Sequence, residues 1–168
     1  MGGEAMKVNR QTVDLDGFPD LVVIYLGMQV HTPKGMGTFL KLGREIRKSV
    51  KAEPDGLLLH ENILFAGKAF HAGMRQYWRD FESMERWTRT LPHQGWWRDF
   101  LQDTGGTGFW HETYIRGGAM EAVYDDMKPV GMMRFAPLVP ARGPMFTSRQ
   151  RLGSGGDGPP PVVPETVA

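Results

Sequence analysis

The apolar and polar positions along the chain follow strand and helix periods in turn. Residues 20–30, DLVVIYLGMQV, are β-branched and almost continuously apolar, which predicts a strand covered on both faces. From Pro33 to Ala52 the apolar side chains recur at helical spacing after the capping pair Thr32-Pro33, which predicts a helix. Residues 57–65 and 70–78 flank the short link AGKA, so they are expected to form a hairpin.

Two shorter helices and a further strand are expected after the hairpin. Asp80 can cap the helix FESMERWT, and Pro92 opens the helix HQGWWRDFLQD, which the pair Gly105-Gly106 closes. Residues 108–118 then read as a strand, and MEAVYDDM as a short additional strand or arm. The order strand, helix, hairpin, helices, strand is βαββαβ, so the fold class is α+β and ferredoxin-like.

One domain is expected in a chain of 168 residues. We place it at residues 20–140, between an N-terminal extension, 1–19, and a Gly- and Pro-rich tail, 141–168, whose composition predicts disorder. Helices cover one face of a ferredoxin-like sheet, and the other face needs a second copy of the chain or a ligand to cover its apolar side chains. We therefore expect a homodimer.

Charge and composition exclude several classes of partner. A net charge of +1, with the basic residues interspersed among acidic ones, argues against a nucleic-acid partner. The longest apolar run is about half the length that a membrane-spanning helix needs. The absence of cysteine excludes disulfides and thiolate chemistry and fits a cytoplasmic location.

The segment FWHETYI concentrates polar and aromatic side chains in one predicted strand. Strand alternation places Trp110, Glu112 and Tyr114 on one face and His111 on the other. Alternation alone leaves open which face meets a cavity. The pair His111-Glu112 does not begin a zinc-protease motif, because Ile115 stands where the second histidine would be needed.

Aromatic side chains are dense between Tyr77 and Tyr114, where they predict either a Trp-rich core and dimer interface or a pocket for a planar apolar molecule. The five histidines lack metal-ligand spacing, so no protein-bound metal is expected. A haem needs only one axial histidine, for which His111 or His93 would be the candidates.

Four segments together resemble the antibiotic-biosynthesis-monooxygenase-type, dimeric α/β-barrel family, and within it the subgroup of the fumagillin-pathway monooxygenase. They are DLVVIYLGMQV, RQYWRDFESMERW, PHQGWWRDF and GFWHETYIRGGAMEAVYDDM, and the resemblance covers residues 8–140. It implies a ferredoxin-like dimer that oxidises a small hydrophobic or polyketide-like secondary metabolite. In this family the oxidation often proceeds without flavin or metal, because the deprotonated substrate reacts with O₂ itself, so the resemblance implies that no cofactor is used.

Such chemistry needs a base, a donor for the developing oxyanion and a dry cavity. Under this resemblance His111 is the expected base, and Tyr114 or Trp78 the expected donor. Some members use an asparagine near the end of the first strand, where this chain offers only Gln29 as the nearest amide. The residues expected to bind substrate are Trp110, Glu112, Trp97, His93 and Gln29.

Two other functions fit the same residues. A non-oxidative cyclase or dehydratase of the same fold, with or without haem, would use the same histidine and tyrosine for proton transfer. A non-catalytic binding protein would use the aromatic pocket alone. A structural alternative also exists for Glu112, which would pair with Arg75, Arg98 or Arg116. The sequence does not identify the substrate.

Overall fold

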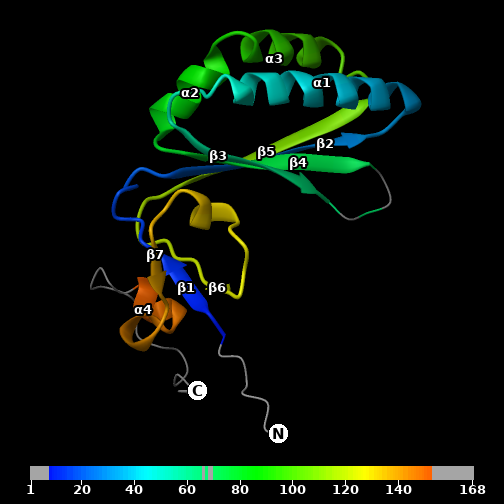
Figure 1. The fold of residues 1–168 in the computed structure, drawn as a ribbon. Coiled ribbons are helices and arrows are strands. Elements are labelled where there is room, and N and C mark those ends of the chain that lie inside the picture. The colour runs from blue at the N-terminus through cyan, green and yellow to red at the C-terminus, as the bar shows by residue number, and fades with distance from the viewer. Residues whose placement is uncertain (1–7, 66, 68–69, 153–168) are drawn as a thin grey trace, which may run out of the picture. The chain divides into compact units, whose positions relative to one another are not determined.

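The computed structural model describes residues 8–65, 67 and 70–152, which form two compact units (Figure 1). One unit is residues 18–116, and the other joins the stretch before residue 18 to the stretch after residue 116. The single domain expected at 20–140 therefore ends earlier than its sequence suggested. The reason is that β6 (Tyr124–Asp125) and β7 (Leu138–Pro140) pair with β1 (Arg10–Val13) and not with the larger sheet. Strand β1 lies in the segment that was predicted as an N-terminal extension.

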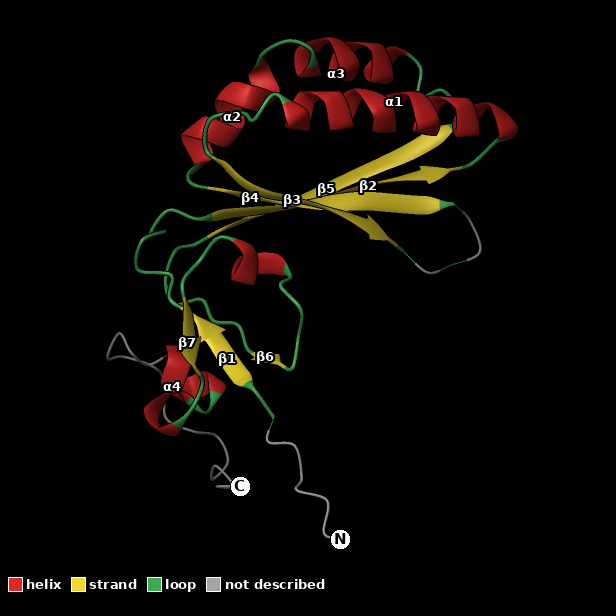
Figure 2. Cartoon of the chain, viewed as in Figure 1, coloured by secondary structure: helices red, strands yellow, loops and turns green. Residues whose placement is uncertain are grey.

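The larger unit is a four-stranded antiparallel sheet with three helices on one side (Figure 2). The strand order is β3-β4-β2-β5, which confirms the predicted ferredoxin-like α+β fold. Its elements in chain order are β2 (Val22–Val30), α1 (Pro33–Lys51), β3 (Leu57–Leu64), β4 (His71–Trp78), α2 (Phe81–Arg89), α3 (His93–Gln102) and β5 (Thr107–Ile115).

The smaller unit contains a three-stranded sheet in the order β6-β1-β7. Two 3₁₀ turns, Gly131–Arg134 and Gly143–Met145, and the short helix α4 (Ser148–Leu152) belong to it. Residues 141–152 thus have regular structure, although their composition placed them in a disordered tail. Arg151 holds this end in place, because its buried guanidinium pairs with Glu121 at 2.7 Å and donates to two backbone carbonyls. The rest of the predicted tail, 153–168, lies outside the described residues.

Both predicted helix caps are present. The Thr32 hydroxyl accepts from the Gly35 N–H at 3.3 Å, and the Asp80 carboxylate accepts from the Ser83 N–H at 2.7 Å. Hydrogen bonds from Arg79 and then from Ser83 lower the pKa of Asp80 to about 2, so the cap stays ionised. Each cap satisfies a backbone N–H that has no partner inside the helix.

The core of the larger unit lies between the sheet and α2. Val22 and Ile24 of β2 pack there with Trp78 of β4 and Met84 of α2. Trp78 is fully buried, and burying an indole of this size contributes about 5 kcal/mol before entropy costs. This core fixes the distance between the helices and one end of the sheet.

In the described part of the chain, no helix is both long and apolar enough to cross a membrane.

The two central strands approach each other at a glycine pair, Gly27 of β2 and Gly73 of β4. A Cβ on Gly73 would overlap the Leu26 carbonyl oxygen, and a Cβ on Gly27 would lie 2.8 Å from the Trp110 indole nitrogen. Only hydrogen fits at either position without moving a strand or a ring.

We therefore expect Gly73→Ala to lower the free energy of unfolding by about 1 to 3 kcal/mol, as overpacking does. Gly37→Ala is the matched control, because nothing lies within 4 Å of a Cβ on this helical glycine and alanine should raise stability by up to about 1 kcal/mol. Urea denaturation of both variants measures the difference. Equal midpoints for Gly73→Ala and the wild type would contradict the close approach.

Candidate active site

A cavity of about 500 Å³ lies in the larger unit between the sheet and the helices. Side chains of strands β2, β4 and β5 and of helices α1, α2 and α3 form its walls. Most of its lining is apolar or aromatic. The polar side chains that line it are Gln76, Glu85, Thr88, Arg89, His93, His111 and Thr113.

The cavity lies against one face of β5. Phe109, His111 and Thr113 line it, so strand alternation turns Trp110, Glu112 and Tyr114 to the opposite face. The exposed side chain of His111 stands on this cavity wall, with its ring centroid 6.0 Å from that of Phe109.

His93 lies deeper in the wall, between two indoles. Its ring centroid is 3.7 Å from that of Trp87 and 4.5 Å from that of Trp96. Its Nδ1 is buried and has no hydrogen-bond partner in the described chain. Burial lowers the pKa of His93 to about 4, so its imidazole is neutral at pH 7.

Gln76 of β4 is a cavity residue that sequence reasoning missed. Its side chain is fully buried, accepts from the Trp78 Nε1–H at 3.2 Å and lies 3.2 Å from Nδ1 of His60. An indole N–H can only donate, so the amide oxygen faces Trp78 and the amide nitrogen donates to His60. The second amide N–H of Gln76 takes no part in these two hydrogen bonds, and Gln76 is among the residues that line the cavity. The available signal was an amide among the apolar residues Ala72, Met74 and Trp78, which alternate with it on one face of β4.

Burial lowers the pKa of His60, which favours the neutral ring that this arrangement needs. With Nδ1 accepting, the proton of His60 is on Nε2. The Trp78–Gln76–His60 chain therefore holds the Gln76 amide in one orientation. Trp78, expected as a donor to substrate, instead uses its only N–H inside this chain.

Trp97, a predicted substrate-binding residue, lines the cavity. It packs edge-on against Phe109 with ring centroids 5.0 Å apart, which joins α3 to β5. His93 and Trp97 thus line the same cavity as His111. That these side chains bind a substrate or act on it stays a prediction.

The other expected site residues lie on the opposite face of the sheet. Tyr114 donates to Glu112 at 2.6 Å, which raises the pKa of the phenol, and Trp110 donates to Nε2 of His71 at 2.8 Å. Gln29 is on this face too, because it is paired with His71 across β2 and β4. Tyr114 is therefore not a donor to a ligand beside His111, and Trp110, Glu112 and Gln29 do not line the cavity.

Of the three arginines named as alternative partners of Glu112, Arg75 and Arg98 pair with other carboxylates, and Arg116 donates to the Phe18 carbonyl. Arg75 pairs with Glu61 at 2.6 Å, and Arg98 pairs with its neighbour Asp99 at 2.9 Å. The carboxylate of Glu112 instead accepts from Tyr114, its neighbour two residues along the same face. Over the residues described, no group of three or more histidines and carboxylates could hold a metal ion.

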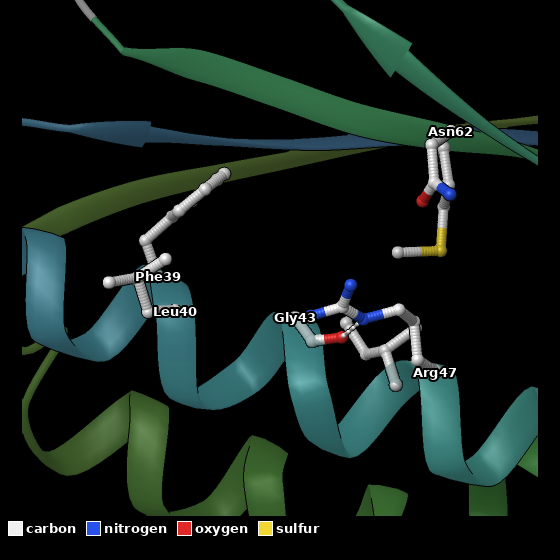
Figure 3. Close-up of a pocket in the computed structure, with 7 residues that line it drawn as sticks. Phe39, Leu40, Gly43, Arg47 and Asn62 are labelled. Carbon is white, nitrogen blue, oxygen red and sulfur yellow. Dashed lines mark hydrogen bonds between the residues drawn. The ribbon is translucent and has the colours of Figure 1, made fainter.

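A second cavity of about 220 Å³ lies between α1 and the sheet (Figure 3). Ile46 and Met74 line both cavities, so these side chains form the wall between them. The remaining residues of the smaller cavity are Phe39, Leu40, Gly43, Arg47 and Asn62.

Solved structures with this fold include two of aldoxime dehydratase. One is 22% identical with a TM-score of 0.63, over 79% of this chain and 39% of that one. The other, OxdRE in complex with butyraldoxime, is 21% identical with a TM-score of 0.67, over 86% of this chain and 43% of that one. This chain thus spans about two fifths of their length, and at these identities the likeness shows the fold alone.

A third similar structure is SnoaB, described as a cofactor-independent oxygenase from Streptomyces nogalater, at 14% identity and a TM-score of 0.45 over 56% of this chain and 91% of that one. No curated protein matches the sequence.

The family model Monooxygenase af470-like matches residues 21–132, which confirms the predicted relation to monooxygenases of this type. The matched stretch includes every strand and helix that forms the cavity. Because the match covers more than half of the chain, the chain belongs to the monooxygenase af470-like family.

Proposed function

We propose that the chain is an oxygenase that oxidises a small, planar, hydrophobic or polyketide-like metabolite in the large cavity. The observation that supports this most directly is the position of His111, on the wall of a cavity that is otherwise mostly apolar and aromatic. A pocket of this kind binds a planar molecule through its faces and leaves a few polar groups to orient it.

In the proposed reaction, His111 removes a proton from a CH₂ group beside a substrate carbonyl. The resulting carbanion reduces O₂, the CH₂ group becomes a second carbonyl, and the other oxygen atom leaves as water. The substrate itself supplies all four electrons, so the balance needs no flavin or metal. We propose accordingly that no cofactor takes part.

Gln76 is the proposed donor to the substrate oxygen, in place of Tyr114 and Trp78. Its second amide N–H is held in orientation by Trp78 and His60, and the Gln76 side chain itself is fully buried. A preorganised donor in such surroundings stabilises a developing oxyanion more than water would. His93 is a weak base, since the pKa of its ring is about 4, and we assign it to the aromatic wall.

The non-oxidative alternative uses the same groups. His111 and Gln76 would move a proton and hold an oxygen without O₂, as a cyclase or dehydratase requires. A haem would need an imidazole nitrogen facing the cavity, and His93 and His111 both line it. A Soret band in the purified protein would support haem, whereas turnover in a protein without that band supports the direct reaction with O₂.

The activity test is oxygen uptake with anthrone, a planar three-ring ketone whose CH₂ group ionises. We expect His111→Ala to lower the rate above the spontaneous background at least a hundredfold, the usual contribution of a general base. Gln76→Leu should lower it about tenfold to a hundredfold through loss of the oxyanion donor. Initial rates from an oxygen electrode provide the measurement.

Tyr114→Phe is the matched control for this assay, because it removes a polar group from the same strand on the opposite face. It should change the rate less than twofold. A large loss of rate in Tyr114→Phe together with an unchanged rate in His111→Ala would contradict the proposal, because it would place the reaction on the face of the sheet that carries Tyr114.

We also propose that the chain functions as a homodimer. Strand β5 is at the edge of its sheet, and Tyr114 and Ile115 at its end are 50% and 59% exposed. Exposed apolar side chains beside an edge strand favour association with another copy. Light scattering at micromolar concentration should give twice the single-chain mass of 18.9 kDa. A mass of one chain would contradict the dimer.

The neutral state of His93 makes stability depend on pH. Its pKa is about 4 in the folded chain and 6.5 in the reference state, so between these values the unfolded chain binds more protons. Stability is complete above about pH 6.5 and decreases as the pH falls to 4, by about 1 to 3 kcal/mol from this residue. His60, whose pKa is also lowered, acts in the same direction.

Urea denaturation at pH 7 and near pH 4.5 tests this dependence. His93→Phe keeps an aromatic ring between the two indoles but cannot take up a proton, so it should lose less stability on acidification than the wild type. Identical losses in the two proteins would mean that His93 does not titrate with a lowered pKa.

A further inference from the structure

The smaller cavity differs from the larger one in having a cation at its wall. Arg47 and Asn62 are its polar side chains, and the other residues that line it are glycine or apolar. In Figure 3 the guanidinium of Arg47 lies along α1, on the side that faces the sheet, and Asn62 is on the opposite wall. The cavity therefore offers hydrogen-bond donors from two sides.

The guanidinium of Arg47 is held at one end only. Its Nε donates to the Gly43 carbonyl at 3.2 Å, one helical turn earlier. In the described part of the chain no carboxylate pairs with it, so its two terminal NH₂ groups remain able to bind a planar anion. The bidentate geometry of arginine matches a carboxylate.

The charged groups of the larger cavity do not compete for that anion. Arg89 and Glu85 both line the larger cavity and pair with each other at 2.7 Å. Arg47 is therefore the cation beside the two cavities that has no acidic partner within the described residues.

The two cavities are close enough for one ligand to occupy both. Met74 separates them together with Ile46, and Asn62 is the register partner of Met74 on β3. Gln76 is two residues from Met74 on the same face of β4, a distance of about 7 Å. A methionine side chain is flexible enough to let a flat molecule pass.

We infer that the substrate is a planar apolar carboxylic acid, whose ring system fills the larger cavity and whose carboxylate is bound by Arg47 and Asn62. This inference rests on the proposed function for the position of the ring system. Its carboxylate would lie about 7 Å or more from the oxygen that Gln76 binds, which corresponds to a fused-ring acid. The exposure of Arg47 at this end lets the charged group keep part of its hydration.

The test compares 2-naphthoic acid with its methyl ester, which has the same rings and no charge, in calorimetric titrations of the full chain. The wild type should bind the acid about fivefold more tightly than the ester at low ionic strength, and salt should reduce this preference. Arg47→Gln should remove the preference and leave ester binding unchanged within twofold. Asn62→Asp should weaken acid binding alone, because it places a negative charge opposite the guanidinium.

Arg44→Gln is the matched control, since this exposed arginine of the same helix lines neither cavity. It should keep the preference for the acid. Equal binding of acid and ester by the wild type, or a preference that survives Arg47→Gln, would overturn the carboxylate site and leave the larger cavity as the site of oxidation. Failure to bind either compound would overturn this inference and count against the proposed function as well.

Discussion

Side chains alternate between the two faces of the sheet, and helices cover only one of these faces. This alternation determines which side chains line the candidate site. In β5 this alternation sends Phe109, His111 and Thr113 toward the helices and turns Trp110, Glu112 and Tyr114 away from them. The same period in β4 places Met74, Gln76 and Trp78 on the helix side. A slip of one residue in either strand would exchange these sets. In the observed register Gly27 faces Gly73, and the missing side chains let β2 and β4 approach closely.

The fold could be predicted from the sequence because its signals are local. The cap residues Thr32 and Asp80 and the two strand periods were sufficient to define βαββαβ. Of the smaller unit, only the strand within MEAVYDDM, which contains β6, was predicted, and its partners could not be found in this way. Its sheet joins β1 to β7 across more than a hundred residues, and strands of two to four residues have too few positions to show a period.

Only part of the candidate site was predictable. His111, His93 and Trp97 were recognised from residue type, and all three line the cavity. Tyr114 and Trp110 were predicted as site residues for the same reason. Both lie on the face away from the cavity, where Tyr114 donates its hydrogen bond to Glu112 and Trp110 donates to His71. Gln76 was not predicted as a site residue, because its proposed role as a donor depends on His60 and Trp78. These two side chains contact its amide in the folded sheet and hold it in one orientation. The burial and orientation of a side chain depend on the assembled sheet, so they cannot be predicted from residue type alone.

The central claim is that ligands bind on the helix side of the sheet, between His111 and Gln76. Side-chain NMR of ¹⁵N-labelled protein tests it most directly, because the Gln76 amide and the Trp110 indole report from opposite faces. Addition of 2-naphthoic acid should shift the signals of the Gln76 amide and the His111 ring and leave the Trp110 indole N–H unchanged. Shifts at Trp110 with unchanged signals at Gln76 and His111 would contradict the account.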